Sequence, residues 1–264
     1  MATELRELAS VNGRITPTAE AMVPLKDDGL YRGDGAFEVI RLYDGRPFAL
    51  VDHLNRLQRS GAAIELEFDR TALESEIEAL LTELGDADGQ LRLIVTRGGR
   101  RLAMTEPIPA HAETVSVATV TYSPTVILNG VKSLSYAANM QATRLAKAQG
   151  ADEAVLVLPD GIVLEPPTSS IFWVSPQGGL RTPALDNGVL ESITRDRLVK
   201  ALEVEEGAWP VADLRAAKEA FLASTTREIQ AVAAIDGTGL SEAPGPRTVE
   251  AQETFAATLG KELQ

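Results

Sequence analysis

The sequence contains no cysteine, and that absence excludes several kinds of chemistry. Disulfide bonds, thiolate nucleophiles and cysteine-ligated zinc all require this residue. Histidine is scarce as well, because only His53 and His111 occur in 264 residues. A histidine-based metal site or a Ser-His-Asp triad would depend on one of these two residues, so we predict no metal site. Polar catalysis must instead use lysine, glutamate, tyrosine, arginine and hydroxyl groups.

Positive charge and long apolar runs are also lacking. The formal net charge is −13 at pH 7, and lysine and arginine form no basic tract, which argues against nucleic acid as a partner. The apolar runs are short and interrupted by charges, and the segment MATELREL carries Glu4 and Arg6 where a signal peptide would need an apolar core. We therefore expect no membrane partner and a cytoplasmic location.

The chain does have enough apolar content, 44%, to bury a full core. Its length suits one large domain or two small ones. The turn-rich region around Pro124 favours two parts. We predict a smaller N-terminal α+β domain over residues 1–120 and a larger C-terminal domain over residues 121–264.

Turn and capping signals organise the predicted N-terminal domain. Asn12-Gly13 is typical of a tight hairpin, and a second hairpin is predicted around Asp44-Gly45. Asp52 is placed to cap the helix that follows it. Thr71 and Glu74 have the spacing of a capping box before a leucine-rich segment with helical periodicity. We therefore predict two helices after the hairpins.

The predicted C-terminal domain alternates strands and helices. We expect a strand that ends near Lys132, a helix over residues 137–148, and a hairpin with Pro159-Asp160-Gly161 at its turn. Thr194 stands just ahead of another predicted helix. The segment AFLASTTREIQAVAAIDG predicts a strand, a hydroxyl-rich turn and a second strand.

Lys132 is an unusual residue in this sequence. There are six lysines against nineteen arginines, and the other five lysines lie in polar or amphipathic surroundings. Val131, Leu134 and Tyr136 surround Lys132, which predicts partial burial. A partly desolvated lysine more readily loses its proton, and the neutral amine is a nucleophile toward aldehydes. The alternative is an ordinary strand-end lysine whose ammonium group reaches water.

Six blocks of the sequence resemble the class IV aminotransferases, the fold-type IV group of pyridoxal-phosphate enzymes. In order along the chain, the blocks are RGDGAFEVIRLYDGRPFALVDHLNRL, TRGG, KSLSYAANM, GADEAVLVLPDGIVLEPPTSSIFWV, LESITRDRL and ASTTREIQAV. The similarity runs from about Asn12 to Gly237. It implies a two-domain α+β or α/β fold like that of D-amino-acid aminotransferase, pyridoxal 5′-phosphate (PLP) as cofactor, and a homodimer whose active site is partly walled by the partner subunit.

The resemblance assigns cofactor roles to several residues. Lys132 matches the lysine that binds PLP covalently and later moves a proton, and Glu165 matches the acid that keeps the pyridine nitrogen protonated. Tyr136 matches a tyrosine that hydrogen-bonds the ring hydroxyl. Leu190 matches an apolar residue packed beneath the ring. Two of these residues have a purely structural alternative. Glu165 could be an ordinary carboxylate at a strand end, and Tyr136 could serve only in packing.

The resemblance also assigns groups that bind the cofactor phosphate. Arg56 matches an arginine whose planar guanidinium pairs with the phosphate. The backbone N–H groups of Ile193 and Thr194, with the Thr194 hydroxyl, stand at a predicted helix start, which is a ready anion site. Ser224 and Thr225 match a further phosphate-contacting turn, although relatives often have glycine where Ser224 stands. Without a ligand, a helix arginine or a capping threonine would look the same in sequence.

The substrate pocket is less clearly marked. Phe37 matches a position that is Phe or Tyr in transaminases, and Val39 falls where lyase members of the family have a threonine. Candidate carboxylate-binding arginines are numerous, and the alternative for those in the TRGGRR turn is a solvated loop. These candidates are Arg32, Arg41, Arg92, Arg97, Arg100 and Arg101.

The resemblance favours a PLP-dependent transaminase that moves an amino group from a D-amino acid, a branched-chain amino acid or an R-amine to a 2-keto acid. The missing hydroxyl at Val39 argues against the first alternative, a 4-amino-4-deoxychorismate lyase that releases pyruvate. The second alternative is a binding protein that kept the fold without the chemistry. Substituting Lys132 distinguishes that protein from either enzyme.

Overall fold

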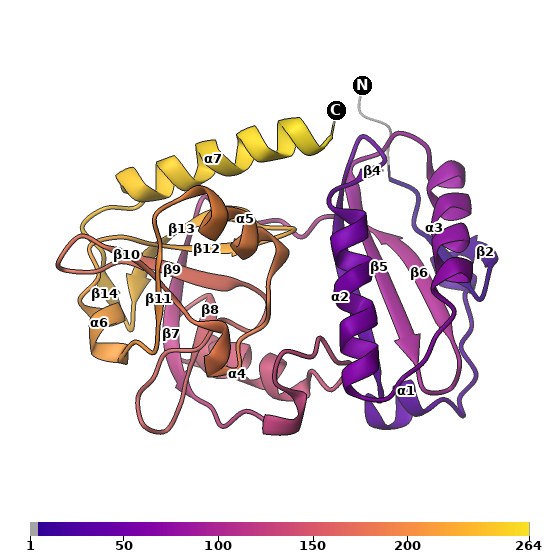
Figure 1. The fold of residues 1–264 in the computed structure, drawn as a ribbon, viewed down its shortest axis with the longest axis horizontal. Helices are drawn as coiled ribbons and strands as arrows, with labels where there is room; N and C mark the ends of the chain where they lie inside the picture. The colour runs from indigo at the N-terminus through magenta and orange to yellow at the C-terminus, as the bar shows by residue number, and fades with distance from the viewer. Residues whose placement is uncertain (1–4, 264) are drawn as a thin grey trace. The chain divides into compact units, whose positions relative to one another are not determined.

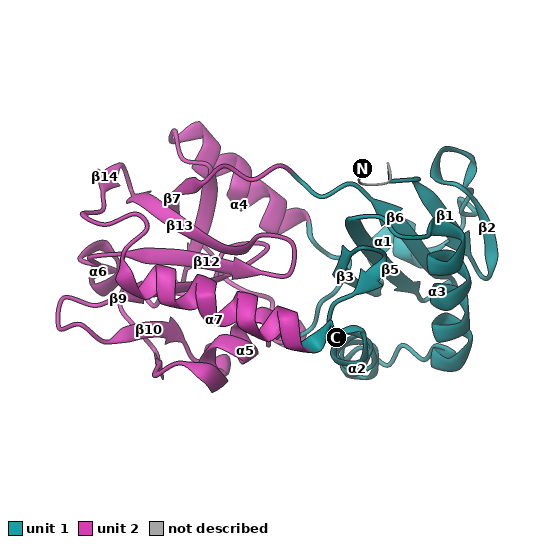
Figure 2. Cartoon of the chain, turned by 90° about the horizontal axis from the view of Figure 1, so that it is seen from above, with its two compact units in different colours: residues 1–109, 131–136, 262–264 teal, residues 110–130, 137–261 magenta. Residues whose placement is uncertain are grey.

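The computed structural model describes residues 5–263, so the first half of the MATELREL segment lies outside the described part. The chain forms two compact units, coloured separately in Figure 2. Unit 1 consists of residues 1–109, 131–136 and 262–264, and unit 2 consists of residues 110–130 and 137–261. In the described chain, no helix combines the length and the apolar character needed to cross a membrane.

Unit 1 is built on a six-stranded antiparallel sheet with the strand order β2-β1-β6-β5-β3-β4. Its strands are β1 (Leu8–Val11), β2 (Arg14–Pro17), β3 (Gly35–Tyr43), β4 (Arg46–Pro47), β5 (Gly89–Thr96) and β6 (Arg101–Glu106). Both predicted hairpins are confirmed. Asn12-Gly13 has φ angles of 49° and 88°, and Asp44-Gly45 has 47° and 73°, the left-handed pair that matches the twist of a two-residue hairpin.

Two helices, α2 (Leu50–Ala63) and α3 (Arg70–Leu84), supply the apolar side chains that cover one face of this sheet (Figure 1). Leu57 of α2 and Leu73, Ile77 and Leu80 of α3 are buried against Ile40 and its neighbours on β3 and β5. The shorter helices are α1 (Asp28–Arg32) and the 3-10 helix η1 (Thr18–Glu20). Burial of this apolar stripe is the main reason that the two helices are stable.

Both predicted helix caps in unit 1 were wrong. Helix α2 begins two residues before Asp52, after Ala49 in a left-handed conformation (φ 52°), so Asp52 lies within the first turn. Helix α3 is capped by Asp69, whose carboxylate accepts a hydrogen bond from the Ala72 N–H at 3.0 Å. An aspartate directly ahead of the helix satisfies a donor of the first turn, two residues earlier in the chain than the predicted Thr71 cap.

Unit 2 contains a mixed sheet with the order β11-β10-β9-β12-β13-β7-β8, with β14 paired to β13. The strands are β7 (Thr114–Thr121), β8 (Glu153–Val157), β9 (Ser170–Val174), β10 (Leu180–Pro183), β11 (Glu205–Gly207), β12 (Ala220–Ser224), β13 (Glu228–Ile235) and β14 (Thr238–Gly239). The helical elements are η2 (Val126–Leu128), α4 (Ala137–Ala148), η3 (Leu185–Asn187), α5 (Ile193–Ala201), α6 (Val211–Arg215) and α7 (Pro246–Glu262).

The sheet of unit 2 is buried on both faces, as its strands indicate. All residues of β8 and β9 are buried, which is the pattern of strands covered from two sides. One apolar cluster is centred on Trp173 and Leu222, and another contains Ala142 and Ala146 of α4 against Ala118 of β7. The small alanine side chains allow α4 to pack closely on the sheet. The predicted helix over residues 137–148 and the strand-turn-strand that forms β12 and β13 are confirmed.

The segment that carries Lys132 departs from the predicted division. A boundary after residue 120 assigned Lys132 to the C-terminal part, whereas residues 131–136 belong to unit 1. Backbone pairing explains the difference. The Phe37 N–H donates to the Lys132 carbonyl at 3.0 Å, and the Leu134 N–H donates to the Gly35 carbonyl at 2.9 Å. The predicted strand near Lys132 is reduced to one bridge, between Ala36 and Ser133.

Candidate active site

The side chain of Lys132 lies against two aromatic rings. Its Nζ atom is 4.4 Å from the centroid of the Phe37 ring and 5.8 Å from that of the Tyr136 ring. The two rings are perpendicular, with centroids 5.3 Å apart. The backbone of the lysine is fixed as well, because its N–H donates to the Ser60 hydroxyl of α2 at 3.1 Å. The structure therefore brings together Lys132, Tyr136 and Phe37, three of the predicted site residues, and gives the amine a defined position.

Arg56 is part of a buried ionic network that the sequence analysis did not predict. Its Nε and Nη2 atoms donate to the two carboxylate oxygens of Glu38, each at 2.7 Å. The His53 Nδ1 atom lies 2.8 Å from Oε2 of the same carboxylate. Glu38 and His53 are fully buried, and Arg56 is 5% exposed. Because Nε and Nη2 bind the same carboxylate, this bidentate pair fixes the orientation of the planar Arg56 guanidinium group.

Charge governs the protonation of this network. Burial alone would raise the pKa of Glu38, but the charge of Arg56 and hydrogen bonds from Arg56 and His53 outweigh it and lower that pKa to about 2. Burial lowers the pKa of His53, and the Glu38 hydrogen bond opposes this shift. Nearby Arg56 and Lys132 also disfavour a charged imidazole. The histidine is therefore neutral near pH 7, and its Nδ1–H donates to Glu38.

Two sequence signals could have revealed this network. Glu38 lies on the same face of β3 as the buried residues Ala36 and Ile40. An acid therefore occupies a core-facing position of an apolar strand. His53 and Arg56 are three residues apart and lie on one face of a helix. Ser60 continues the same face of α2, one turn beyond Arg56. The helix therefore carries both the arginine and the group that binds the Lys132 backbone.

In unit 2, Glu165 and Leu190 are brought together as predicted residues of one site. The Leu190 N–H donates to Oε1 of Glu165 at 2.7 Å. The backbone of Glu165 is also anchored, because its carbonyl accepts from the Leu156 N–H of β8 at 3.1 Å. A backbone donor and a strand anchor therefore hold this carboxylate in a fixed orientation.

The first turn of α5 offers a second group of polar atoms in unit 2. The helix begins at Ile193, two residues earlier than the prediction that placed Thr194 ahead of it, and Ser192 is the cap that accepts from the Arg195 N–H at 3.3 Å. Thr194 is completely buried, and its hydroxyl oxygen has no hydrogen-bond partner within residues 5–263. A buried hydroxyl left unsatisfied at a helix N-terminus suits an anionic ligand.

Ser224 and Thr225 lie at the turn between β12 and β13, as predicted. The Ser224 hydroxyl accepts from the Arg227 N–H at 3.3 Å, and both Ser224 and Thr225 are half-buried. The turn closes with Glu228 at a φ of 56°, a conformation that is uncommon for a residue other than glycine. The hydroxyl groups are thus presented on a tight and well-defined backbone.

Most of the predicted substrate arginines are paired locally within unit 1. Arg92 lies 2.9 Å from Glu106, Arg97 lies 2.7 Å from Asp34, and Arg101 lies 2.7 Å from Glu76. Arg32 is exposed and 3.5 Å from Asp28, and Arg100 donates to the Gly98 carbonyl at 3.2 Å. These contacts account for the local positions of the five arginine side chains. That any of the five binds the substrate carboxylate stays a prediction.

Arg41 differs from those arginines. Arg41, Val39 and Phe37 are every second residue of β3, so their three side chains share one face of the sheet. The Nε atom of Arg41 is buried without a hydrogen-bond partner in the described chain. Its guanidinium carbon is 4.9 Å from the centroid of the Tyr43 ring. An unsatisfied buried donor on the face that carries Phe37 marks Arg41 as a candidate anion-binding residue.

Comparison with known proteins places this chain in a family. The family model described as amino-transferase class IV matches residues 35–235. The chain is 34% identical over 272 residues to a D-alanine aminotransferase of Bacillus licheniformis, covering 94% of this chain and 95% of that protein. It is also 34% identical over 253 residues to a putative branched-chain-amino-acid aminotransferase of Methanocaldococcus jannaschii, covering 86% and 87% of the two chains.

A solved structure gives the same result. The PLP-bound form of a hypothetical aminotransferase from Mycobacterium tuberculosis matches with a TM-score of 0.86 and 26% identity, covering 97% of this chain and 99% of that one. The match spans nearly all of both chains, so the two units are those of a fold-type IV transaminase. The chain belongs to the class IV aminotransferases and is a transaminase.

Proposed function

We propose that this transaminase uses PLP, that Lys132 binds it covalently, and that the first turn of α5 binds its phosphate. The observation that carries the proposal is the buried Thr194 hydroxyl, which has no hydrogen-bond partner among the described residues at the start of α5. A phosphate oxygen placed there would satisfy it and would also be stabilised by the helix dipole. Class IV aminotransferases as a family depend on PLP, and the Mycobacterium tuberculosis relative was solved with it.

The residues that would hold the cofactor fall into three roles. When bound, PLP supplies an electron-poor ring that stabilises negative charge on the carbon that loses a proton. Lys132 Nζ binds the cofactor and accepts and returns that proton. The Glu165 carboxylate, oriented by the Leu190 N–H, holds a proton at the ring nitrogen, with Tyr136 and Leu190 as further ring contacts. The proposed phosphate-binding residues are Arg56, Ile193, Thr194, Ser224 and Thr225.

The proposed substrates are an amino acid as donor and a 2-keto acid as acceptor. The two relatives named above support a D-amino acid and a branched-chain amino acid equally, because their identities to this chain are the same. The protein is therefore mixed with PLP and given D-alanine, L-leucine or an R-amine in separate cuvettes. Bleaching of the visible absorbance of the bound cofactor by one donor, restored by 2-oxoglutarate, identifies the amino donor.

The same experiment addresses the lyase alternative. Release of pyruvate from 4-amino-4-deoxychorismate without a keto acid would support a lyase, provided that none of the three donors bleaches the absorbance. Val39 is half-buried on the same face of β3 as Phe37 and has no hydroxyl to relay a proton. We therefore expect donor-dependent bleaching and no release of pyruvate from 4-amino-4-deoxychorismate.

The proposed function requires a residue that binds the donor carboxylate, and we assign this role to Arg41. Replacing it with methionine in the variant Arg41→Met is expected to raise the KM for an amino acid donor by about tenfold or more, because a charge-assisted pair to the carboxylate is lost. An R-amine has no carboxylate, so its KM should change little. Steady-state kinetics with both donors checks this, and an equal rise for both would remove Arg41 from the role. Arg70→Met, which removes an arginine paired with Glu74 on α3, is the matched control and should leave both KM values unchanged.

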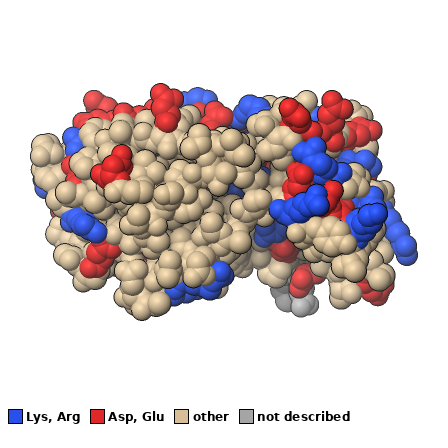
Figure 3. All heavy atoms as spheres, turned by 90° about the horizontal axis from the view of Figure 1, so that it is seen from below, with Lys and Arg blue, Asp and Glu red and all other residues tan. Residues whose placement is uncertain are grey.

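We also propose that the protein is a homodimer. The segment before and within α1 exposes large apolar side chains, with Met22 84% and Leu25 75% exposed, followed by Leu30 and Tyr31. In unit 2, Val126 and Ile127 are similarly exposed, and Figure 3 shows a broad uncharged area on that unit. Apolar surface of this kind is typical of a contact with another protein, and a second copy of this chain is the proposed partner.

Substitution within the exposed segment tests the dimer. Leu25→Glu is expected to weaken self-association by at least about tenfold, because a charge is placed where apolar surface would be buried. Light scattering across a dilution series measures the dissociation constant. Val51→Glu, at an exposed apolar position on α2, is the control. A wild-type protein that is monomeric at micromolar concentration would contradict the proposal.

A further inference from the structure

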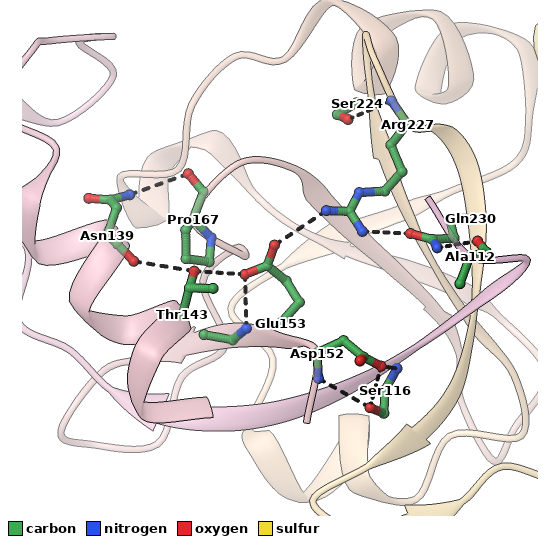
Figure 4. A network of polar contacts seen from close by, with 11 residues as sticks. Ala112, Ser116, Asn139, Thr143, Asp152, Glu153, Pro167, Ser224, Arg227 and Gln230 are labelled. Carbon is green, nitrogen blue, oxygen red and sulfur yellow. Dashed lines mark hydrogen bonds and ion pairs between the residues drawn. The ribbon is translucent and has the colours of Figure 1, made fainter. Parts of the chain in front are cut away.

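The side chain of Arg227 is buried beside the turn that carries Ser224 and Thr225 (Figure 4). Its backbone N–H closes the turn onto the Ser224 hydroxyl at 3.3 Å. The guanidinium group then extends away from the turn. Nη1 donates to the Gln230 side-chain oxygen at 2.5 Å, and Nη2 lies 3.3 Å from a carboxylate oxygen of Glu153. One residue therefore contacts the turn through its backbone and the interior of unit 2 through its side chain.

The partners of Arg227 connect the turn to other elements of unit 2. Glu153 is on β8, which is separated from β13 by β7 in the sheet. The other oxygen of Glu153 accepts from the Thr143 hydroxyl of α4 at 2.9 Å. Gln230 in turn donates to the Ala112 carbonyl at 2.6 Å. Arg227 thus anchors the turn across a strand to α4 and to the chain that leads into β7 (Figure 4).

The guanidinium group of this arginine is paired with a carboxylate, but its hydrogen-bonding capacity is only partly satisfied within the described residues. Its side chain and that of Glu153 are each 9% exposed, and their closest approach is at the long end of the hydrogen-bond range. The Nε atom is buried without a partner in the part of the chain that the structure describes. Burial lowers the pKa of Arg227, and Glu153 opposes the shift, yet an arginine starts so high that it stays charged.

We propose that Arg227 is a positioning residue for the cofactor phosphate, holding the Ser224–Thr225 turn in shape through its side-chain anchor in unit 2. This inference rests on the proposed function, in which that turn receives the phosphate. The ion pair with Glu153 holds the guanidinium group in place. The ligand recognised in this way is a phosphate dianion, so the effect is specific to the phosphorylated form of the cofactor.

The test compares the binding of PLP with the binding of pyridoxal, which lacks the phosphate. Dissociation constants for both are measured from the visible absorbance of the bound compounds. In wild-type protein PLP should bind much more tightly than pyridoxal. Arg227→Met is expected to reduce this ratio by about tenfold or more, since the turn that binds the phosphate loses its anchor. Arg215→Met removes an arginine that pairs with Asp236 on the surface of the same unit and should leave the ratio unchanged.

Removing one partner of a buried pair destabilises a fold, so a second variant accompanies the first. Arg227→Met combined with Glu153→Gln leaves no unpaired carboxylate, and circular dichroism confirms that it is folded. The preference of the double variant for PLP over pyridoxal should fall as it does in the single variant. A folded double variant whose ratio stays within about twofold of wild type overturns the proposal. Wild-type protein that binds no PLP overturns the proposed function as well, so the two failures are distinguishable.

Discussion

Lys132→Ala should lose transamination by several orders of magnitude, because the covalent step and the main proton carrier disappear together. The fold should be kept. The lysine side chain is only half-buried and meets the faces of two rings, and the hydrogen bonds of its backbone to Phe37 and Ser60 do not depend on the side chain. Turnover is measured with the donor that the absorbance experiment identifies, and thermal unfolding is followed in parallel.

A direct chemical measurement accompanies the kinetic one. Borohydride reduction of the protein with PLP should fix the cofactor to the peptide that contains Lys132, and mass spectrometry locates it. The exposed Lys147 of α4 provides a control, because Lys147→Ala should leave both turnover and labelling unchanged. Labelling that persists in Lys132→Ala, or turnover within about tenfold of wild type, would show that another residue binds the cofactor.

Local signals in the sequence predicted much of the fold. The hairpins at Asn12-Gly13 and Asp44-Gly45 were identified because few residue pairs adopt two left-handed conformations in succession. Helix α4 was predicted with its observed limits. The cap of α2 was missed because Ala49, in a left-handed conformation, carries no capping side chain and gives no signal.

The site was predicted through the resemblance more than through pattern. Scarcity and apolar neighbours identified Lys132, and the six blocks that resemble class IV aminotransferases are confirmed by the family match over residues 35–235. Glu38 and His53 were missed because their significance depends on pairing between a strand and a helix. Arg227 was missed for the same reason, since its partners lie on β8 and β13. Contacts between distant elements leave little trace in one sequence.

Glu38→Gln is expected to have the second large effect, on both stability and cofactor binding. The substitution removes the charge that faces Arg56, and breaking a buried ion pair in this way costs about 3–5 kcal/mol of unfolding free energy. Arg56 also loses the carboxylate that fixes its plane, so PLP should bind more weakly. Glu106→Gln in the half-exposed pair with Arg92 is the matched control and should cost no more than about 1 kcal/mol. Chemical denaturation of the two variants measures the difference.

The pH dependence of stability supplies an independent check on the same network. The pKa of Glu38 is lowered from 4.5 to about 2 in the folded protein. The unfolded chain therefore binds more protons as the pH falls below about 4.5, and the stabilisation from Glu38, on the order of 3 kcal/mol, is lost between that pH and about 2. The lowered pKa of His53 acts in the same direction, because unfolding takes up a proton once the pH falls below about 6.5.

The wild-type protein should accordingly lose stability from about pH 6.5 downward, and more steeply below about pH 4.5. Glu38→Gln has no carboxylate at this position, so its stability should fall less over the acid range, and the difference between the two proteins should narrow toward pH 2. Parallel pH profiles for wild type and Glu38→Gln would mean that Glu38 is not ionised against Arg56. A flatter profile for the variant would identify the Glu38–Arg56 pair as a source of acid sensitivity within unit 1.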